Sequence, residues 1–531
     1  MCDSRVSTMG PRRPLLIVLF LTVFFAIFFV ARYGTHDGGH IKKVEEKIEV
    51  LIHLGPEKPK DPASPCSEHL GWLEPYQFSY PIKYVARDII VVPSTTGQRP
   101  SLTFIGEPLF DEFTTVDMTQ SSTVNIKQCL PPLYLEVPQN NPGPADASNM
   151  IFSLQTTTNR LKSTVKHLAR WLPHTGARLY VIVIETEELP ADDEAISKLE
   201  KEFHAQGMNV TIVHPVQPLD TFPQRYFSLV SLMYEARNEK TQWITLIDDD
   251  TFFPSMHDLQ KEFSRYDPRK PHYLGSLSED WWAVNHYGLM AFGGASVFLS
   301  LPLAQTIHEH NDECKEHPRT TAGDVTVMDC IYRFSSTKLT HLPGLHQIDI
   351  HGDLSGFYES GREMLSLHHW KEGLEHLEMH KLHLVSDICD SCFLQRWQFP
   401  HETVLTNGFS LSQYPQGHIS GQKPGILNTG MGGKDIEKIN LEEMEKTWGD
   451  DINVLHSLAP TREKLEDGAK VQYKLLDSMM VNSDPEGQGK GDVVRQVYWR
   501  EGEEEEGGGR EMGTVMVLNW KKGERPPPPE G

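Results

Sequence analysis

Between residues 150 and 247 the chain alternates short apolar runs with stretches whose apolar residues recur at helical spacing. The apolar runs predict buried strands at 150–154, 179–184, 210–213 and 243–247. Three intervening helices are predicted from residues that share one face: Leu161, Val165, Leu168 and Leu172; Ile196, Leu199 and Phe203; Phe227, Val230 and Tyr234. Because strands alternating with helices form βαβ units, this pattern predicts an α/β fold with a Rossmann-like, mostly parallel sheet.

The last of these strands ends in three consecutive carboxylates, Asp248, Asp249 and Asp250, within WITLIDDDTFFP. Ligands of open α/β sheets bind at the carboxyl ends of the strands, where these acids lie. Adjacent carboxylates repel one another, and a divalent cation such as Mg²⁺, Ca²⁺ or Mn²⁺ relieves that repulsion. A solvated acidic turn is the alternative. The buried strand in front of the acids favours a metal site.

The first 65 residues predict a membrane anchor followed by a stem. Residues 14–31 are apolar and uncharged, and at a helical rise they span roughly 27 Å, near the thickness of a thin bilayer core. Arg5, Arg12 and Arg13 precede this run, which predicts a cytosolic tail at 1–13 and a lumenal location for the rest. A cleaved signal peptide is the alternative, but Phe29 is bulky for a cleavage site. The short span suits the Golgi.

Composition divides the rest of the chain. A polar stem is expected at 32–65, and an irregular or β-rich lumenal region at 66–144 that ends in the breaker NNPGP. We expect the catalytic domain at 145–420 and a C-terminal extension at 421–482. From 483 to 531 Gly, Glu and Pro dominate, which predicts a disordered acidic and proline-rich tail.

Charge and cysteine content narrow the class of protein further. Lys and Arg number 50 against 73 for Asp and Glu, and the net charge of −23 argues against a nucleic-acid partner. Six of the seven cysteines lie in the predicted lumenal part, where disulfides form. Cys314 with Cys330 is the preferred pair, worth about 3 kcal/mol. Cys389-x-x-Cys392 predicts a local bridge, with half a zinc site or a redox pair as alternatives.

Several other residues have a functional and a structural interpretation. Gly293 and Gly294 lie in an apolar stretch, where they indicate backbone close to a ligand or plain packing. Asp324 begins a predicted helix, which by itself indicates a cap. His368 and His369 follow an apolar run and are candidate metal ligands or structural histidines.

Taken together, six pieces of sequence in the same order resemble the Fringe-like β-1,3-glycosyltransferases of glycosyltransferase family 31. The resemblance is closest to the plant and fungal Fringe-related branch once labelled a domain of unknown function, and it covers about residues 150–400. The matching pieces are SLQTTTNR, WITLIDDDTFFP, YLGSLSED with YGLMAFGGASVFLS, GDVTVMDC, HQIDIHGDLSGF and LSLHHW.

This resemblance implies a GT-A-type fold, a nucleotide-sugar donor that is most often UDP-linked, and Mn²⁺. It implies metal ligation mainly by Asp250 with Asp248 or Asp249 nearby, completed by His368 or His369. The implied donor-side residues are Thr156, Thr157, Thr158, Arg160, Asp248 and Asp249. The implied acceptor-side residues are Gly293, Gly294, Trp281 and Trp282, and the two tryptophans are also consistent with core packing or a lipid-facing rim.

The resemblance also implies inversion at the anomeric centre, with Asp324 as the base that deprotonates the acceptor hydroxyl. The family often has two acids before the valine, whereas here Gly323 precedes Asp324. We expect the helix N-terminus to lower the pKa of Asp324 and keep it ionised. If Asp324 is not the base, Asp280 and Asp353 are the next candidates.

These observations predict a type II Golgi membrane protein whose lumenal domain transfers a sugar to a glycan or glycoprotein. The alternatives are an inactive glycan-binding protein with the same fold and a lumenal protein whose acids bind only Ca²⁺. Asn209 begins the sequon N-V-T, which predicts a glycosylated asparagine if it is exposed. The sequence leaves the donor sugar, the acceptor, the linkage and the oligomeric state open.

Overall fold

The computed structural model describes residues 67–94, 99–125, 130–138, 143–184, 192–372, 374, 377–415, 439–449, 456–481, 492–504 and 510–524. The chain divides into a unit at Met1–Ser67 and a second unit at Glu68–Gly531, and almost all described residues belong to the second. The predicted tail, anchor and stem lie outside the described residues. Within these residues, no helix is long and apolar enough to cross a bilayer.

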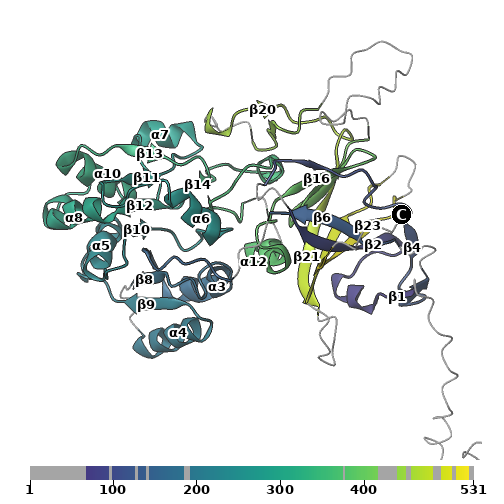
Figure 1. The fold of residues 1–531 in the computed structure, drawn as a ribbon, viewed down its shortest axis with the longest axis horizontal. Helices are drawn as coiled ribbons and strands as arrows, with labels where there is room; N and C mark the ends of the chain where they lie inside the picture. The colour runs from purple at the N-terminus through teal and green to yellow at the C-terminus, as the bar shows by residue number, and fades with distance from the viewer. Residues whose placement is uncertain are drawn as a thin grey trace, which may run out of the picture. The chain divides into compact units, whose positions relative to one another are not determined.

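A seven-stranded sheet forms the α/β part of the second unit (Figure 1). From one edge to the other its strands are β9 (Asn209–Val213), β8 (Arg178–Val183), β7 (Met150–Thr156), β10 (Trp243–Leu246), β12 (Val297–Ser300), β11 (Tyr273–Gly275) and β13 (Leu339–His341). The first four strands are mutually parallel, and β12 runs antiparallel to both of its neighbours. This mixed α/β sheet fits the GT-A-like fold that the sequence predicts.

Helices cover both faces of this sheet, because alternate strand residues point to opposite sides. Phe152 of β7 packs with α3 (Thr158–Leu168), α4 (Asp193–Ala205) and α6 (Met256–Phe263). Its neighbour Ile151 packs with α5 (Phe222–Glu235), α8 (Leu301–Glu309) and α10 (Gly323–Phe334). Figure 1 shows α3 and α6 on one side of the strands and α5, α8 and α10 on the other. The predicted strands and the first three helices are therefore confirmed.

Short elements lie between the later strands of the sheet or follow its last strand. They are α7 (Trp281–Tyr287), α9 (Asn311–Lys315), β14 (Leu345–His346), α11 (Ser355–Tyr358), β15 (Ser366–Leu367), α12 (Met379–Leu382) and α13 (Ser386–Cys389). The parallel pair β14–β15 brings the 346 and 367 regions together, and Phe252 after β10 bridges to Leu367. These pairings place the histidines at 368 and 369 next to the acidic loop.

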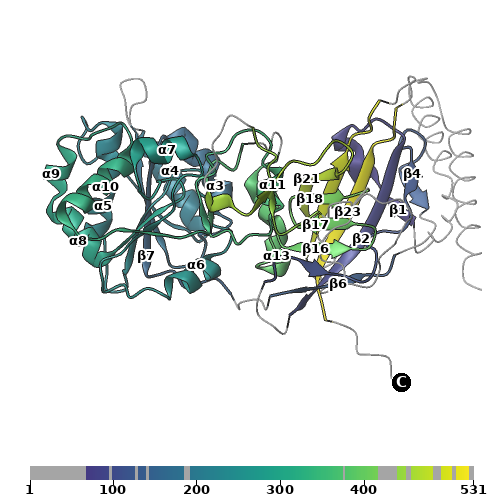
Figure 2. The ribbon, with the colours of Figure 1, turned by 90° about the horizontal axis from the view of Figure 1, so that it is seen from above.

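A second sheet is built from strands that come from distant parts of the chain (Figure 2). Its order is β3 (Thr103–Phe104), β16 (Arg396–Phe399), β17 (Thr403–Thr406), β18 (Ser410–Gln413), β21 (Val471–Val481), β22 (Val493–Arg500), β23 (Thr514–Lys522), β2 (Ile82–Pro93) and β4 (Thr114–Val116), with β6 (Leu133–Val137) also paired to β2. Figure 2 shows the yellow C-terminal strands beside the purple β2.

This sheet corrects the predicted division of the chain. The prediction of a disordered tail from 483 onward is wrong for β22 and β23, because VVRQVYWR and TVMVLNWKK bury apolar side chains between the Gly- and Glu-rich stretches. Of the two alternatives for residues 66–144, irregular or β-rich, the β-rich one agrees with the structure, because this region supplies β2, the longest strand of the sheet. The predicted boundary at 420 also differs, because β16, β17 and β18 belong to the second sheet and not to the α/β part.

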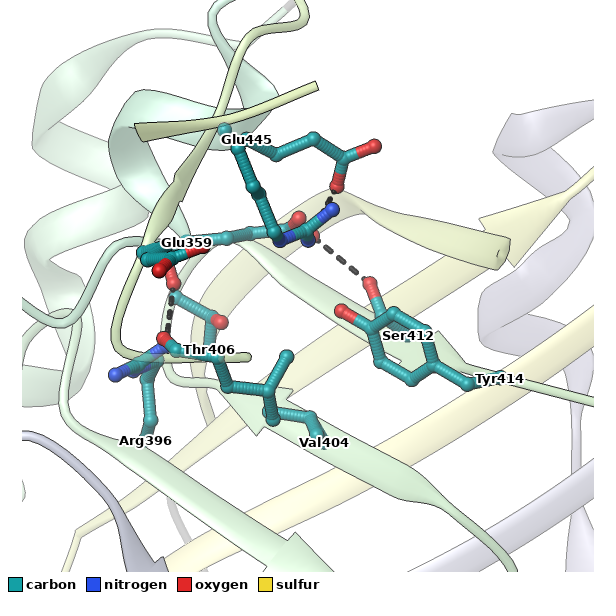
Figure 3. Close-up of a pocket in the computed structure, with 11 residues that line it drawn as sticks. Glu359, Arg396, Val404, Thr406, Ser412, Tyr414 and Glu445 are labelled. Atoms are coloured by element: carbon teal, nitrogen blue, oxygen red, sulfur yellow. Dashed lines mark hydrogen bonds and ion pairs between the residues drawn. The ribbon is translucent and has the colours of Figure 1, made fainter. Parts of the chain in front are cut away.

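A buried set of charges attaches the segment around α11 to the second sheet (Figure 3). Glu359 accepts hydrogen bonds from Ser412 Oγ at 2.8 Å and Gln472 Nε2 at 2.6 Å, and Lys470 Nζ lies 3.1 Å from its carboxylate. Arg396 Nη1 donates to the Glu359 carbonyl at 2.9 Å. Burial raises the pKa of Glu359, but Lys470 and the hydrogen bonds outweigh it, so the net pKa is lowered. The carboxylate therefore stays ionised in a region with only about 10 Å³ of free space.

Candidate functional site

The loop after β10 gives each of the three adjacent acids a different environment. Asp249 accepts a hydrogen bond from the hydroxyl of Thr156, at the end of β7. It also binds the guanidinium of Arg160, whose Nε lies 2.6 Å from Asp249 Oδ2. Arg160 lies in the first turn of α3, whose N-cap is Thr157. The side chain of Asp249 is nearly buried, whereas that of Arg160 is 64% exposed. Asp249 therefore fastens the acidic loop to the turn that precedes α3.

Asp248 and Asp250 converge on one imidazole. His368 Nε2 lies 3.0 Å from Asp250 Oδ1 and 3.4 Å from Asp248 Oδ2. The other ring nitrogen, Nδ1, lies 3.2 Å from the carbonyl oxygen of Gln347. A proton on Nδ1 satisfies that carbonyl, so the Nε2 lone pair of a neutral His368 points at the two carboxylates. This is the arrangement in which a histidine binds a metal.

The electrostatics at this point favour a positive charge beside the carboxylates. Burial raises the pKa of Asp248 despite His368. Burial also acts to raise the pKa of Asp250, but the hydrogen bond and charge of His368 outweigh it and lower the value to about 2. For His368 burial acts to lower the pKa, while Asp250 and Asp248 raise it to about 9. Without a metal, a proton on Nε2 is therefore the cation that the two acids share.

Gly294 leaves room for the His368 ring. A Cβ atom at this position would lie 2.1 Å from His368 Nδ1, so no larger residue fits without displacing the imidazole. The carbonyl of Gly294 accepts a hydrogen bond from Thr251 Oγ1 at 2.9 Å, and the same oxygen atom of Thr251 accepts one from the backbone amide of Asp248. The glycine pair predicted to approach a ligand therefore packs against the acidic loop and its histidine.

His369, the other predicted metal ligand, points elsewhere. Its Nδ1 lies 3.1 Å from Asp349 Oδ1, and its ring lies over His368 with centroids 3.8 Å apart. Asp349 in turn accepts a hydrogen bond from Ser278 Oγ. The backbone of His369 has a positive φ of 44°. The structure thus brings His368, and not His369, to the acids.

Asp324 lies on the other side of the same glycine pair. Its Oδ2 accepts a hydrogen bond from the amide of Gly293 at 3.0 Å, and its Oδ1 accepts one from the amide of Val325 at 2.9 Å. The prediction that the helix N-terminus lowers the pKa of Asp324 is wrong. Burial and the charge of Asp248 outweigh the two amides and raise the pKa to about 6. A carboxylate with this pKa is suited to proton transfer near neutral pH.

Tyr226, on α5, was not predicted from the sequence. Its hydroxyl is buried and has no hydrogen-bond partner within the described residues. A Cβ atom at Gly293 would lie 2.5 Å from Tyr226 Oη and 3.6 Å from Asp324 Oδ2, so both groups lie close to this glycine. In the sequence Tyr226 belongs to an apolar helical face, which gave no signal that its hydroxyl reaches the site.

The other predicted residues have varied surroundings. Trp281 and Trp282 are exposed on α7, which excludes core packing, and Trp282 stacks on His286 with centroids 4.7 Å apart. Thr158 begins α3 and is only partly exposed. Asn209 is exposed on the edge strand β9. The two remaining candidate bases serve as local caps, since Asp280 accepts from Trp282 N at 3.0 Å and Asp353 accepts from Ser355 N at 3.0 Å.

Both predicted disulfides are present. Cys314 at the end of α9 is bonded to Cys330 of α10, and Cys389 is bonded to Cys392 at the end of α13. The first bond joins the segment before Asp324 to the helix that Asp324 begins, and the second lies under the second sheet, where Asn407 Nδ2 donates to Cys392 Sγ at 2.8 Å. Disulfides are typical of an oxidising compartment.

The residues present fit a bound Mn²⁺ or similar divalent cation. Two carboxylates and one imidazole form a mixed oxygen and nitrogen donor set, and each carboxylate has an oxygen atom within 3.4 Å of His368 Nε2. Replacing the shared proton by a metal ion relieves the same repulsion and keeps the hydrogen bond of His368 to Gln347. The donor set therefore suits Mn²⁺ better than Ca²⁺, which takes oxygen ligands alone.

One family model matches a part of the chain that contributes residues to this site. Residues 283–379 match a family model described as a protein of unknown function, DUF604. The matched stretch begins in α7, ends at α12, and contains the glycine pair, Asp324 and both histidines. A comparison with curated proteins finds no match.

Among solved structures, similarity is found to a mannosyltransferase of Pyrobaculum calidifontis in complex with GDP-mannose and Mn²⁺, at 10% identity and a TM-score of 0.27, covering 41% of this chain and 63% of that one. The glycosyltransferase GlyE of Streptococcus pneumoniae matches at 16% identity and a TM-score of 0.25, covering 36% and 45%. A 4-diphosphocytidyl-2C-methyl-D-erythritol synthase of Anaerococcus prevotii matches at 10% identity and a TM-score of 0.25, covering 37% and 88%. Superpositions this loose leave the chemistry to be argued from the residues of the site.

Proposed function

We propose that this protein is a metal-dependent, inverting glycosyltransferase that moves a sugar from a nucleotide sugar, UDP-linked by resemblance, to a hydroxyl group of a glycan or glycoprotein. The observation that carries the proposal is the contact of both Asp248 and Asp250 with Nε2 of His368. The consecutive residues Gly293 and Gly294 contact Asp324 on one side and His368 on the other. A metal site and a candidate base therefore border the same space, as sugar transfer requires.

Each residue has a defined role in this proposal. Asp248, Asp250 and His368 hold the Mn²⁺, which neutralises the developing charge of the nucleoside diphosphate leaving group. Asp249, Thr156 and Arg160 fix the acidic loop against the first strand.

The base and its neighbours act on the acceptor. Ionised Asp324 accepts the proton of the acceptor hydroxyl, and the amides of Gly293 and Val325 orient its carboxylate. The buried hydroxyl of Tyr226 has no hydrogen-bond partner in the described structure and packs against Gly293, whose amide binds Asp324. Exposed Trp281 and Trp282 offer flat faces for stacking on an acceptor sugar.

Nucleotide binding tests the proposal directly. Calorimetry of the purified lumenal chain should show UDP binding that depends on Mn²⁺, and Asp250→Asn should abolish that dependence. Asp312→Asn, at an exposed acid on α9, is the matched control and should bind as the wild type does. If Asp250→Asn folds and still binds UDP in a Mn²⁺-dependent way, the acids do not hold the metal ion. A scan of UDP-sugars for hydrolysis and transfer then identifies the donor, whereas binding without turnover supports the inactive alternative.

We also propose a single-pass type II orientation in the Golgi, with the catalytic domain in the lumen. The support is the apolar run at 14–31 with its preceding arginines and the disulfides of the described chain. Protease added to sealed microsomes should spare everything beyond about residue 32. If the added protease digests the α/β part, that part lies on the cytosolic side and the proposed orientation is wrong.

A further inference from the structure

Two histidines and a carboxylate face one another where α3 meets α12, outside the site described above (Figure 1). His167 lies near the end of α3, Glu378 caps α12, and His380 lies within it. One ligand atom from each of the three residues lies within 4.8 Å of the others. His380 Nδ1 is 3.2 Å from Glu378 Oε2. Sequence spacing alone does not reveal this group, because more than two hundred residues separate its parts.

The buried member of this group has an unused ligand atom. His167 is 8% exposed, and its Nδ1 is buried without a hydrogen-bond partner within the described part of the chain. An unpaired polar atom at this depth costs free energy that a metal bond would recover. Glu378 is contacted by the ammonium of Lys166, at 2.5 Å to Oε1, so one cation already occupies the carboxylate.

The charge state of the two histidines also suits a metal. Burial, together with the nearby His380 and against the opposing effect of Glu378, lowers the pKa of His167 to about 4. Burial lowers the pKa of His380 as well, again despite Glu378. Burial therefore favours the neutral form of both imidazoles, which is the form that binds metal. A simple ion pair with the carboxylate would instead require protonated histidines.

We propose that His167, Glu378 and His380 form a second metal site, which binds Zn²⁺ with water as the fourth ligand. Two imidazoles and one carboxylate are a zinc donor set, and Zn²⁺ accepts this number of protein ligands. The ion displaces Lys166 from Glu378. The proposal is independent of the glycosyltransferase activity, because none of the three residues belongs to the Asp248–Asp250–His368 set.

The position of the site gives it a structural consequence. The His167 ring packs on Trp370 with centroids 4.7 Å apart, and Trp370 Nε1 donates to the carbonyl of Asp250 at 2.8 Å. On its other side α12 contacts β21 of the second sheet. A Zn²⁺ ion that joins α3 to α12 therefore fixes the α/β part to the second sheet and holds the backbone of Asp250 through Trp370.

Zinc binding is measured in the full chain carrying Asp250→Asn, so that the first metal site does not contribute. After treatment with a chelator, this protein should bind one equivalent of Zn²⁺ in a competition titration, and Zn²⁺ should raise its melting temperature. Adding His380→Asn should weaken that binding at least about a hundredfold, and Glu378→Gln should do the same. His317→Asn, at an exposed histidine beside a carboxylate, is the matched control and should leave binding unchanged.

Lys166→Met separates the metal site from a plain ion pair. Under the proposal it removes a competing cation and tightens Zn²⁺ binding, with a tetrahedral Co²⁺ absorption spectrum that His380→Asn abolishes. If Glu378 only forms an ion pair with Lys166 and the histidines bind no metal, Lys166→Met lowers the melting temperature, and Zn²⁺ has no effect on the wild type or on Lys166→Met. Failure of the Asp250→Asn protein to bind Zn²⁺, or equal binding in its folded His380→Asn derivative, overturns the proposal.

Discussion

Replacing Gly294 by alanine tests whether the position of His368 controls the metal site. The added Cβ would lie 2.1 Å from His368 Nδ1 and 2.2 Å from Cε1, whereas real Cβ contacts almost never fall below 3.0 Å. The ring must therefore move by about an ångström, and it is 3% exposed, held by Gln347 on one side and by Asp250 on the other. The backbone of Gly294 is not in the left-handed region, so the effect comes from space alone.

Two costs follow from that displacement. Overpacking a filled site destabilises a protein by about 1–3 kcal/mol, which lowers the melting temperature by a few degrees. Moving a ligand away from its hydrogen-bonded position lowers metal affinity by about 10–100-fold. We therefore expect a folded Gly294→Ala protein that binds Mn²⁺ and UDP at least about tenfold more weakly, measured by calorimetry.

The control for this experiment is Gly106→Ala, because a Cβ at Gly106 meets no atom within 4 Å. It should match the wild type in both melting temperature and Mn²⁺ affinity. If Gly294→Ala folds and its Mn²⁺ affinity stays within about twofold of the wild type, His368 is not a ligand and the assignment of the metal site is refuted.

The remaining predictions concern the acceptor side. Because burial raises the pKa of Asp324 to about 6, kcat/KM should rise with pH through about 6, and Asp324→Asn should remove this limb and lower kcat at least about a hundredfold. The pKa of Asp324 is higher in the folded protein than in the unfolded chain, so protonated Asp324 stabilises the fold. Relative to Asp324→Asn, the wild type should have this extra stability below about pH 4 and lose it as the pH rises through about 6. Equal pH dependence of the two melting temperatures would contradict the raised pKa. Tyr226→Phe should lower kcat/KM about tenfold with an unchanged melting temperature, since the hydroxyl has no partner in the described structure; full activity would exclude it from the site.

The α/β part could be predicted from the sequence because its signals are local. Each of these strands and helices carries its own apolar period within a short stretch of sequence. The acids were found because they are adjacent and follow a buried strand. The sequence could not show which histidine contacts the acids, because His368 and His369 are adjacent and have the same side chain. The pairing of β14 with β15 places His368 next to Asp250.

The second sheet could not be predicted because its pairing is not local. β2 lies between β4 and β23, so a strand at residue 82 depends on one at residue 514, and nothing in either segment identifies the other. The Gly- and Glu-rich stretches around β22 and β23 also dominate the average composition of this part of the chain, so it resembles a disordered tail. The pKa of Asp324 was predicted with the wrong sign for a related reason, since the helix N-terminus is visible in the sequence and burial is not.

Truncation distinguishes a disordered tail from a sheet strand. β23 lies between β22 and β2, and Val515, Val517, Leu518 and Trp520 are fully buried. Burying four such side chains is worth roughly 6–12 kcal/mol, comparable to the whole stability of a typical domain. A chain that stops after residue 504 should therefore lose its cooperative melting transition and its resistance to protease.

The same truncation should also weaken binding at the proposed metal site, although β23 does not contribute to that site. Trp520 Nε1 donates to Gln496 at 2.6 Å, Gln496 donates to Asn407 at 3.0 Å, and Asn407 contacts Cys392 beside α13, which packs on β22 and β23. Because α12 and α13 lead back to α3 and the acidic loop, loss of β23 should weaken Mn²⁺-dependent UDP binding in any soluble fraction that remains. A chain that stops after residue 524 keeps every strand and should match the wild type. Equal stability of the two truncated chains would show that β23 does not hold the sheet together.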